Sequence, residues 1–572
     1  MHHNGMKPKR KVRVLETRDS IANMEVTKMK VLVLGGVAAG TKVAAKLMRE
    51  DRSNEVIVLN KGANISYAGC GLPYYVGHVI EDQAQLIVNT PAKYEKLTGV
   101  KVYTETEATK VLPEEKKVVA KDLKTGEETT YEYDKLVIAV GASSAKPPIE
   151  GVDLENVFFV RTPEDAINIR NLVDGGSVKK AVVVGAGYIG LEIAENLKAQ
   201  GIRPFVLDMV PQILAPGFDK EMADYVEGKL SDAGIPVVTG VQVTAIEGDE
   251  KVEKVITSKK AYKADMVVMS AGIRPNTEFL GDTGLEMFKG KILTDELGQT
   301  NLPDIYAAGD CAMVHNAITG KAAWSPMGST ANIAGRLIAQ NIMGKSLPYR
   351  GVLGTAVCKL PGLNVGRTGL TEKQAKEEGF HPVSVITVVD DKAHYYVGAA
   401  SFVMKMIADR DTLKLLGVQV VGPGAVDKVV DIAVTGITLK ATLPQLADMD
   451  LAYAPPFSTA IHPFENTLNV LMNKILGNFE TITPAEYAAG EAEGYRVIDG
   501  CMVPSIPGAP YVELTTVDGP IEGLDPEEKL LLVCNKGKRA YLLQNRLKFY
   551  GYRNTKVLEG GITFTDPDIL GE

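Results

Sequence analysis

Two copies of one short pattern restrict the fold of this chain more than any other feature. In each copy an apolar run that predicts a β-strand leads into a glycine-rich turn, a helix and a second strand. The first copy spans residues 30–59 and the second spans residues 180–207. This order is typical of the dinucleotide-binding unit of doubly wound α/β proteins, in which the helix N-terminus faces a pyrophosphate. Two units in one chain therefore predict an α/β fold that binds two dinucleotides.

The second copy carries the complete glycine fingerprint. We expect Gly185 to make the turn, Gly187 to admit the pyrophosphate and Gly190 to let the helix pack against the strand. Asp208 follows the second strand, where a carboxylate can bind the 2′-hydroxyl of a ribose and would repel a 2′-phosphate. This copy is therefore predicted to bind NADH, and NADPH less well.

The first copy departs from the fingerprint at two positions. Between Gly35 and Gly40, Val37 replaces the middle glycine and Ala38 follows it. Asn60 stands where an acidic residue usually ends the second strand. Its amide can still bond to a ribose hydroxyl, but less strongly than a carboxylate. We still expect this turn to bind a dinucleotide.

A single cysteine, Cys70, follows the first unit between small residues and has no second cysteine nearby. The chain has 572 residues and five cysteines that lie far apart, which fits a reducing cytoplasm and not a disulfide framework. A redox thiol of this kind must take its partner from a substrate sulfur, an oxygen or a thiol of another domain. We therefore expect Cys70 to be catalytic.

Charge and hydropathy exclude other classes of function. The net charge of −8 gives no reason to expect a nucleic acid as partner. No apolar run approaches the roughly 18 residues that a membrane span needs, and no metal site is predicted. Residues 1–28 lack an apolar signal core, so we expect a disordered extension and a start at Met29. These observations predict a cytoplasmic protein.

Further segments resemble the flavoprotein disulfide reductases. Residues 300–310 form an apolar run that ends in Gly-Asp, similar to the strand whose aspartate binds the flavin ribityl chain. The resemblance therefore implies that Asp310 contacts FAD. Residues 136–141 and 267–275 are similar to the two crossover strands of that family, and residues 346–475 to its dimerisation region. In this last region strands are expected at 352–359, 382–389, 399–408 and 414–421.

The resemblance implies a fold of two Rossmann-like domains, an α+β dimerisation domain and a C-terminal domain. The expected boundaries are 29–146 with 264–335 for the FAD-binding domain, 147–263 for the NAD(P)H-binding domain, 336–475 for the dimerisation domain, 476–493 for a linker and 494–572 for the last domain.

Around Cys70 the sequence is similar to one branch of this family. Ser66 and the run Cys70-Gly71-Leu72-Pro73-Tyr74-Tyr75 resemble the single-cysteine coenzyme A disulfide reductases, NADH oxidases and peroxidases. Peroxidases of this branch have a histidine in the first glycine turn, where this chain has Ala38. The resemblance therefore implies sulfur chemistry with coenzyme A at Cys70, with Ser66 at the substrate, more than reduction of oxygen.

Two tyrosines and a histidine imply an active site shared between subunits. Tyr453 and Tyr396 lie in stretches that resemble those whose tyrosines reach the partner's site, although Tyr395 could replace Tyr396. His462, before a proline, is similar to the acid/base histidine of glutathione reductases, with a structural role as the alternative. The resemblance implies a homodimer.

The loop from Cys534 to Arg539 resembles the active-site loop of rhodaneses. Backbone N–H groups of such a loop and a helix N-terminus favour a thiolate or a persulfide anion, and Arg539 is expected at the substrate. Residues 497–505 run almost directly into Ile-Pro-Gly-Ala at 506–509, so the usual arginine and first helix are missing from this rhodanese-like domain. The loop therefore predicts either a sulfur carrier or a scaffold. Cys501 either resolves a persulfide on Cys534 or is structural.

The sequence and the resemblance together predict an FAD-dependent, NADH-driven reductase of coenzyme A persulfide, polysulfide or coenzyme A disulfide. Coenzyme A is expected as a substrate or as a mixed disulfide on Cys70. Two alternatives remain open, namely an NADH oxidase with a passenger tail and a sulfurtransferase or sulfur carrier.

Overall fold

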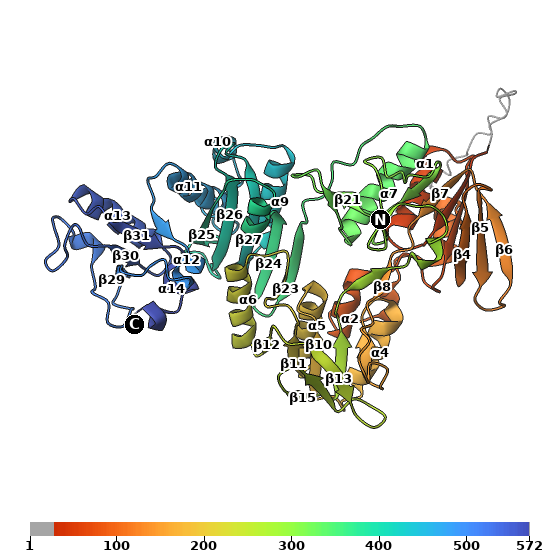
Figure 1. Ribbon diagram of the computed structural model, residues 1–572, viewed down its shortest axis with the longest axis horizontal. Coiled ribbons are helices and arrows are strands. Elements are labelled where there is room, and N and C mark those ends of the chain that lie inside the picture. The colour runs from red at the N-terminus through yellow and green to blue at the C-terminus, as the bar shows by residue number, and fades with distance from the viewer. Residues whose placement is uncertain (1–27, 571–572) are drawn as a thin grey trace, which may run out of the picture.

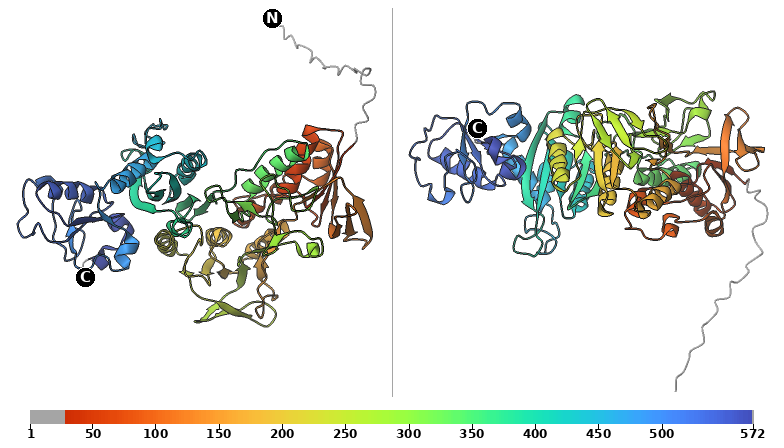
Figure 2. Two further views of the ribbon diagram at one scale, coloured as in Figure 1. Left: turned by 45° about the horizontal axis from the view of Figure 1, so that its top comes forward. Right: turned by 90° about the horizontal axis from the view of Figure 1, so that it is seen from below.

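The computed structural model describes residues 28–570. Residues 1–27 of the expected extension lie outside the described residues. Figure 1 shows the first glycine-turn unit at one end of the molecule and the C-terminal domain at the other, with two further domains between them. The two views in Figure 2 show the same separation of the ends. Within 28–570 no helix combines the length and the apolar character that crossing a membrane requires.

The first glycine-turn unit folds into a parallel five-stranded sheet. Its main elements are β1 (Lys30–Leu34), α1 (Ala39–Glu50), β2 (Glu55–Asn60), β3 (Lys101–Thr104), β7 (Lys135–Ile138), β20 (Ile305–Ala307) and α7 (Gly328–Ile342). The strands lie in the order β20-β7-β1-β2-β3. Residues 31–34 of the central strand are buried, as in parallel sheets covered on both faces. An antiparallel sheet of β4 (Thr106–Leu112), β5 (Lys117–Asp122) and β6 (Glu128–Glu132) adjoins it.

The second glycine-turn unit repeats this architecture in the order β12-β11-β10-β16-β9. Its elements are β9 (Val157–Phe159), α4 (Pro163–Asp174), β10 (Lys180–Val184), α5 (Tyr188–Ala199), β11 (Arg203–Leu207), α6 (Lys220–Asp232), β12 (Val237–Val238) and β16 (Met266–Met269). Both sheets place their glycine turns at the carboxyl ends of central strands, where ligands of such folds bind.

One predicted boundary needs correction. Strand β16 pairs with β10 and β9 of the second sheet, whereas residues from 264 onward were expected in the first unit. A wholly buried apolar strand carries no local signal for which of two sheets it joins. The chain crosses between the units in β8 (Ala142–Ser144) and β17 (Ile273–Pro275), which pair antiparallel. The second unit therefore extends to Met269.

The third domain is a five-stranded antiparallel sheet in the order β23-β24-β27-β26-β25. Its elements are β23 (Ala356–Leu360), β24 (Leu363–Gly369), α8 (Glu372–Glu377), β25 (Pro382–Asp390), β26 (Ser401–Asp409), β27 (Leu415–Gly422), α9 (Val426–Thr438), α10 (Leu443–Ala447) and α11 (Pro463–Ile475). All four expected strands are present, and three of them have bounds within two residues of those expected. The strand expected at 352–359 begins four residues later, and the unpredicted β24 follows it because Pro361-Gly362 forms a two-residue turn.

The C-terminal domain is a four-stranded parallel sheet in the order β28-β31-β30-β29. Its elements are β28 (Thr481–Ile482), α12 (Pro484–Ala488), β29 (Arg496–Asp499), β30 (Leu530–Val533), α13 (Lys538–Phe549), β31 (Thr555–Leu558) and α14 (Gly561–Phe564). Residues 476–493 are thus not a free linker, because β28 joins this sheet. Thr483 and Glu486 form a capping box at the start of α12, a sequence signal that the small, polar composition concealed.

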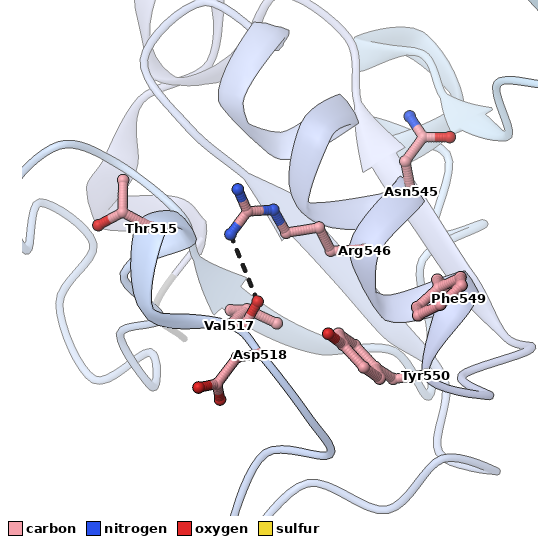
Figure 3. Close-up of a pocket in the computed structure, with 7 residues that line it drawn as sticks. All are labelled: Thr515, Val517, Asp518, Asn545, Arg546, Phe549 and Tyr550. Carbon is pink, nitrogen blue, oxygen red and sulfur yellow. Dashed lines mark hydrogen bonds between the residues drawn. The ribbon is translucent and has the colours of Figure 1, made fainter.

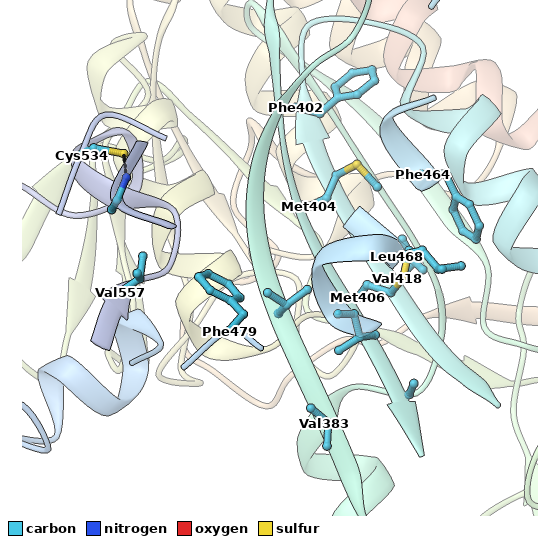
Figure 4. Close-up of a cluster of buried hydrophobic side chains, with 14 of the residues drawn as sticks. Val383, Phe402, Met404, Met406, Val418, Phe464, Leu468, Phe479, Cys534 and Val557 are labelled. Carbon is cyan, nitrogen blue, oxygen red and sulfur yellow. Dashed lines mark hydrogen bonds between the residues drawn. The ribbon is translucent and has the colours of Figure 1, made fainter. Parts of the chain in front are cut away.

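A buried glutamate fixes the C-terminal domain to the third domain. Glu559, which is 1% exposed, accepts hydrogen bonds from the Ile386 N–H at 2.7 Å and from Lys474 Nζ and Thr481 Oγ1 at 2.6 Å each. One cluster of buried apolar side chains continues across this contact, with Phe479 between Val557 and the sheet of the third domain (Figure 4). The two domains therefore pack as one body.

A buried ion cluster joins the second glycine-turn unit to the third domain. Lys405 in β26 is 3% exposed and lies 2.5 Å from a carboxylate oxygen of Glu221, 3.0 Å from Glu372 and 3.3 Å from Asp219. Burial opposes the charge of Lys405, but the three carboxylates outweigh it and raise its pKa. The lysine therefore remains charged and compensates the carboxylates around it.

Replacement of this lysine tests the cluster. Lys405→Met leaves three carboxylates in a buried site without their cation, so we expect the free energy of unfolding to fall by about 3–5 kcal/mol. Lys373→Met is the matched control, because its side chain is 81% exposed on the adjoining helix, and it should change stability by less than about 0.5 kcal/mol. Urea unfolding measures both. Equal losses in the two variants would contradict the proposed importance of the cluster.

Candidate active site

Cys70 lies beside the first glycine turn. It occupies the 3-10 turn Gly69–Gly71, and helix α2 (Leu72–Val76) follows directly. Ser66 precedes it, and the Ser66 N–H donates to the Gly36 carbonyl at 2.9 Å, so the cysteine segment is tied to the turn. Cys70 is exposed. The other four cysteines are buried, namely Cys311, Cys358, Cys501 and Cys534.

The first glycine turn is held by close backbone contacts. Gly35 has φ +100°, and a Cβ there would lie 2.1 Å from the carbonyl oxygen of Ala139. A Cβ on Gly40 would lie 1.8 Å from the carbonyl oxygen of Gly35. Val37 and Ala38 lie between them, and Ala38 is the N-cap of α1. The side chain of Ala38 offers no cap, so the first N–H groups of α1 are available to an anion.

The side-chain amide of Asn60 is used mainly in hydrogen bonds that hold the first glycine turn and the loop after β2. Its Oδ1 accepts from the Gly36 N–H at 2.9 Å, and its Nδ2 donates to the carbonyls of Gly62 and Asn64 at 2.7 and 3.1 Å. The two N–H donors of the amide are thereby used, and one lone pair of Oδ1 remains for the predicted ribose hydroxyl.

Asp310 follows β20 and forms an ion pair that the sequence did not predict. Its carboxylate accepts from Arg161 Nη2 at 2.5 Å, and Arg161 Nε donates to the Ala142 carbonyl at 2.8 Å. The only tryptophan of the chain, Trp324, donates from Nε1 to the Asp310 carbonyl at 3.0 Å. Arg161 lies just before helix α4, and a single sequence offers no sign that this arginine reaches Asp310.

The second glycine turn has the same close backbone contacts as the first, but its middle glycine has free space around it. A Cβ on Gly185 (φ +111°) would lie 2.3 Å from the Ser270 carbonyl oxygen, and one on Gly190 would lie 1.9 Å from the Gly185 carbonyl oxygen. A Cβ on Gly187 would meet no atom within 4 Å. The first and third glycines are therefore required by the protein's own packing, and the second leaves space for a ligand.

Polar groups next to the second turn also fit a dinucleotide. The Asp208 carboxylate accepts from the N–H groups of Ala186 at 2.6 Å and Val210 at 3.0 Å, which places it at the turn. Among the described residues, the buried Tyr188 hydroxyl and Ser270 Oγ have no hydrogen-bond partner. Buried polar groups are rarely left unpaired, so these groups fit a site that a polar ligand completes.

A second residue that the sequence did not predict, Glu192, affects the pKa of the Cys70 thiol. The partial enclosure of Cys70 and the carboxylates of Glu192 and Asp310 raise the pKa of its thiol, whereas Arg161 opposes them. Tyr74 donates to a Glu192 carboxylate oxygen at 3.1 Å. The sequence signal for Glu192 is an acidic residue within the apolar helix that follows the second turn.

The two predicted interfacial tyrosines lie on exposed loops of the third domain. Tyr453 is 50% exposed and its hydroxyl is hydrogen-bonded to Tyr395, which raises the pKa of Tyr453. Tyr396 is exposed beside them. The structure therefore brings together Tyr453 and Tyr395, the residue that the sequence left as an alternative to Tyr396.

His462 is a buried helix cap, which argues against the predicted acid/base role. It is 3% exposed, and its Nδ1 accepts from the Phe464 N–H at 3.2 Å at the start of α11. Glu465 completes the capping box. Burial, together with the charge of Lys428, lowers the pKa of His462 to about 4. The imidazole is therefore neutral and engaged, and the structural alternative fits it better.

Cys534 lies in a loop whose backbone points at its sulfur. The Sγ atom accepts from the N–H groups of Gly537 at 3.2 Å and Ala540 at 3.3 Å, and the residue is 2% exposed. Gly537 has φ +90° and precedes the first residue of α13. This arrangement stabilises a negative charge on sulfur by backbone dipoles.

Two charged side chains in the Cys534 loop, Arg539 and Lys536, are paired with carboxylates in the structure. Arg539 donates to both carboxylate oxygens of Glu513 at 3.0 and 3.2 Å and to the Gly500 carbonyl. Lys536 lies 2.7 Å from Asp390 of the third domain. Arg539, which was predicted to lie at the substrate, is therefore engaged by a carboxylate in this structure. Its partner Glu513 lies 26 residues earlier in the chain, so no local motif indicates the pair.

Cys501 does not have the properties of a resolving thiol. Burial and the neighbouring Asp499 carboxylate raise the pKa of Cys501 to about 12. Asp499 also accepts from the N–H groups of Cys501, Ser505 and Ile506, and so orders the short loop that replaces the missing helix. A thiolate is the reactive form of cysteine, so the structural alternative fits Cys501 better.

An open hollow of about 490 Å³ lies on the C-terminal domain, away from these residues (Figure 3). It is bounded by Arg546, Phe549 and Tyr550 on one side and by Val517 and Asp518 on the other. Arg546 donates to the Val517 carbonyl at 3.3 Å across it. No predicted site residue contributes to this hollow.

Comparisons with known proteins add the following. The model of the pyridine nucleotide-disulphide oxidoreductases matches residues 29–331, and that of their dimerisation domain matches residues 355–463. An NADH oxidase of Methanocaldococcus jannaschii is 37% identical over 78% of this chain and 100% of its own. A CoA-dependent NAD(P)H sulfur oxidoreductase of Pyrococcus furiosus is 37% identical over 76% of this chain and 97% of its own. The structure of a NAD-dependent persulfide reductase from A. fulgidus is 36% identical, covers 94% of this chain and 100% of its own, and has a TM-score of 0.89.

The burial of His462 predicts how the free energy of unfolding depends on pH. The unfolded chain binds a proton at His462 below about pH 6.5, whereas the folded chain does so only near pH 4, so acid destabilises the fold through this residue. His462→Asn keeps a cap acceptor but does not titrate. Between pH 7.5 and pH 5, its free energy of unfolding should therefore fall by about 2 kcal/mol less than that of the unmodified chain. Urea unfolding at both pH values measures this. An equal fall in both proteins would contradict the buried, neutral histidine.

Proposed function

This chain belongs to the pyridine nucleotide-disulphide oxidoreductase family, and we propose that it is an FAD-dependent, NADH-driven reductase of coenzyme A persulfide, polysulfide or disulfide. The observation that carries the proposal is the state of Cys70. It is the exposed cysteine beside the first glycine turn, and the four other cysteines are buried. A reducible sulfur for Cys70 must therefore come from a substrate.

The two glycine turns divide the cofactors between them. The first turn and Asp310, held by Arg161, would bind FAD, which when bound passes two electrons from NADH to a disulfide. The second turn and Asp208 would bind NADH. The Asp208 carboxylate supports a preference for NADH because it would repel the 2′-phosphate of NADPH.

Cys70 performs thiol–disulfide exchange in this proposal. Its thiolate attacks the inner sulfur of coenzyme A persulfide, an S–S bond to coenzyme A forms, and hydrosulfide leaves. Two electrons from NADH then cleave the mixed disulfide to the Cys70 thiolate and coenzyme A. Ser66, four residues before Cys70, would lie at the substrate, and the mixed disulfide would be the resting form.

The C-terminal domain is proposed to be rhodanese-like and to carry sulfur on Cys534. The two N–H groups directed at its Sγ support this, because they would stabilise a persulfide anion. The persulfide reductase from A. fulgidus is similar over 94% of this chain, and the M. jannaschii NADH oxidase over 78%. The wider match supports a link between the C-terminal domain and persulfide chemistry.

We further propose a homodimer that shares its active sites. The match to a dimerisation domain supports this, as does the group of exposed apolar and aromatic side chains on the third domain. These are Tyr395, Val397, Tyr453, Phe457 and Ile461. Such a patch is typical of a protein interface, and it would bring Tyr453 and Tyr396 to the partner's Cys70. The free cysteines support a cytoplasmic location.

NADH oxidation without oxygen separates this function from its alternatives. With coenzyme A disulfide or persulfide as acceptor, we expect anaerobic turnover that Cys70→Ser reduces by about 10³-fold or more, because no other exposed thiol accepts the sulfur. Cys534→Ser is the matched control, and it should keep reduction of coenzyme A disulfide within about twofold.

Two other results would identify the alternative functions. NADH consumption that needs oxygen and ignores both coenzyme A acceptors would identify an NADH oxidase instead. Loss of all activity in Cys534→Ser, with sulfur transfer between small thiols in the unmodified protein, would identify a sulfurtransferase.

A further inference from the structure

The chain from Ser66 to Val88 forms a closed loop that carries Cys70. The loop closes where the Val88 N–H donates to the Ser66 carbonyl at 3.1 Å. Within it, the side chain of Ile80 packs directly beside the cysteine turn, because a Cβ on Gly71 would lie only 3.1 Å from Ile80 Cδ1. The position of Ile80 therefore affects the turn that holds the thiol.

Arg170 of α4 holds this loop from the second glycine-turn unit. Its Nη1 donates to the carbonyls of Tyr75, Ile80 and Glu81 at 3.3, 3.0 and 3.0 Å. The guanidinium also lies over the Tyr75 ring, 4.3 Å from its centre, and the arginine side chain is 12% exposed. Carbonyls on both sides of the bend after α2 thus converge on one largely buried cation, which fixes Ile80.

The second nitrogen of this guanidinium determines the tautomer of His78. Arg170 Nη2 lies 2.9 Å from His78 Nδ1, and a guanidinium donates hydrogen bonds but accepts none. Nδ1 must therefore be the acceptor, and the ring proton is on Nε2, which donates to the Asp174 carboxylate at 2.7 Å. With its two nitrogens engaged in this way, the imidazole is neutral.

The other charged groups near the loop have different partners or face solvent. On α5, Glu192 accepts from Tyr74, and Glu195 pairs with a lysine of β23. In the loop itself, Asp82 caps the 3-10 turn that follows it, and Glu81 is exposed. The charged groups that bond to the imidazole therefore both come from α4.

We propose that Arg170 is a positioning residue for Cys70 and that His78 makes this positioning depend on pH. The inference deepens the proposed function and rests on it only for the redox role of Cys70. When solvent supplies a second proton to the imidazole, Nδ1 becomes a donor that faces the donor Nη2, and the hydrogen bond between them is lost. The Arg170 guanidinium then faces a second cation, and its hold on Ile80 weakens.

This change falls in the pH range in which enzymes work. An imidazole gains its second proton between about pH 5 and 8, whereas an arginine stays charged throughout. The loop is therefore held above this range and loosened below it. Loosening uncovers the Cys70 thiol, which is partly enclosed in the held loop, and removes its fixed position for thiol–disulfide exchange.

His78→Asn separates the charge from the hydrogen bond. The left-handed backbone at residue 78 (φ 59°) suits asparagine, whose Oδ1 replaces Nδ1 as the acceptor for Arg170 and does not titrate. Hydrogen exchange of the reduced holoenzyme reports the state of the loop, because the N–H groups of Val79 and Ile80 donate to the Tyr74 carbonyl. From about pH 8 to pH 5.5, we expect their protection factors to fall by about threefold to tenfold in the unmodified enzyme, the effect of one hydrogen bond, and to stay constant in His78→Asn.

The reaction of Cys70 with 4,4′-dithiodipyridine tests whether the loop positions the thiol. The reagent forms a mixed disulfide with the exposed thiol and releases a thiopyridone, in acid as well as at neutral pH. Comparison of the unmodified enzyme with His78→Asn at each pH cancels the titration of Cys70 itself. We expect equal rates at about pH 8, and a rate about three to ten times higher in the unmodified enzyme at about pH 5.5.

His381→Asn is the matched control. His381 of the third domain also pairs with an aspartate, Asp411 at 2.6 Å, and its replacement should change neither measurement. Arg170→Gln should give the loosened loop and the faster reaction already at pH 8, because the guanidinium is removed. Flavin absorbance checks that each variant is a folded holoenzyme.

The same response to pH in the unmodified enzyme and in His78→Asn would overturn the role of His78. A loop that stays protected at pH 8 in Arg170→Gln would overturn the role of Arg170. Loosening of the loop without a change in the reaction rate would overturn its link to Cys70. Failure of the proposed sulfur substrate would leave these results unchanged, because neither measurement uses coenzyme A, so the two hypotheses can fail separately.

Discussion

The close approach of backbone at the two glycine turns is the constraint on which the rest of the molecule depends. At Gly35 and Gly185 a carbonyl oxygen lies where a Cβ would otherwise be, at 2.1 and 2.3 Å. Because these positions lack side chains, each helix can start directly above the end of a central strand, with its first N–H groups directed outward. The Cys70 segment is then tied to the first turn through the bond from Ser66 to Gly36. A redox thiol and two dinucleotide sites thus follow from the same local geometry.

Contacts between domains determine the chemistry of that thiol. The carboxylates that act on Cys70 come from α5 of the second glycine-turn unit and from the end of β20, and the opposing arginine comes from the segment before α4. The ion cluster at Lys405 joins the third domain to the second glycine-turn unit, and the buried Glu559 joins the C-terminal domain to the third. Cys70 therefore has properties that its own segment, exposed and flanked by small residues, would not give it.

Much of the fold could be predicted from the sequence because its signals are local. The apolar runs that open the two units at residues 30 and 180 form the strands β1 and β10. Features that depend on distant partners were missed. Strand β16 joins the other sheet, and β28 pairs with a strand more than seventy residues later. Arg161 and Glu192 act on residues far away in the chain, whereas Arg539 and His462 are engaged by groups that no motif reveals.

The central claim is that Cys70 takes its partner from coenzyme A, and mass spectrometry of the intact enzyme tests it most directly. The account predicts that incubation with coenzyme A disulfide adds one coenzyme A per subunit, that proteolysis places it on the peptide with Cys70, and that NADH removes it. A Cys70 that stays unmodified, or that acquires only oxygen while coenzyme A is absent from every peptide, would contradict the account.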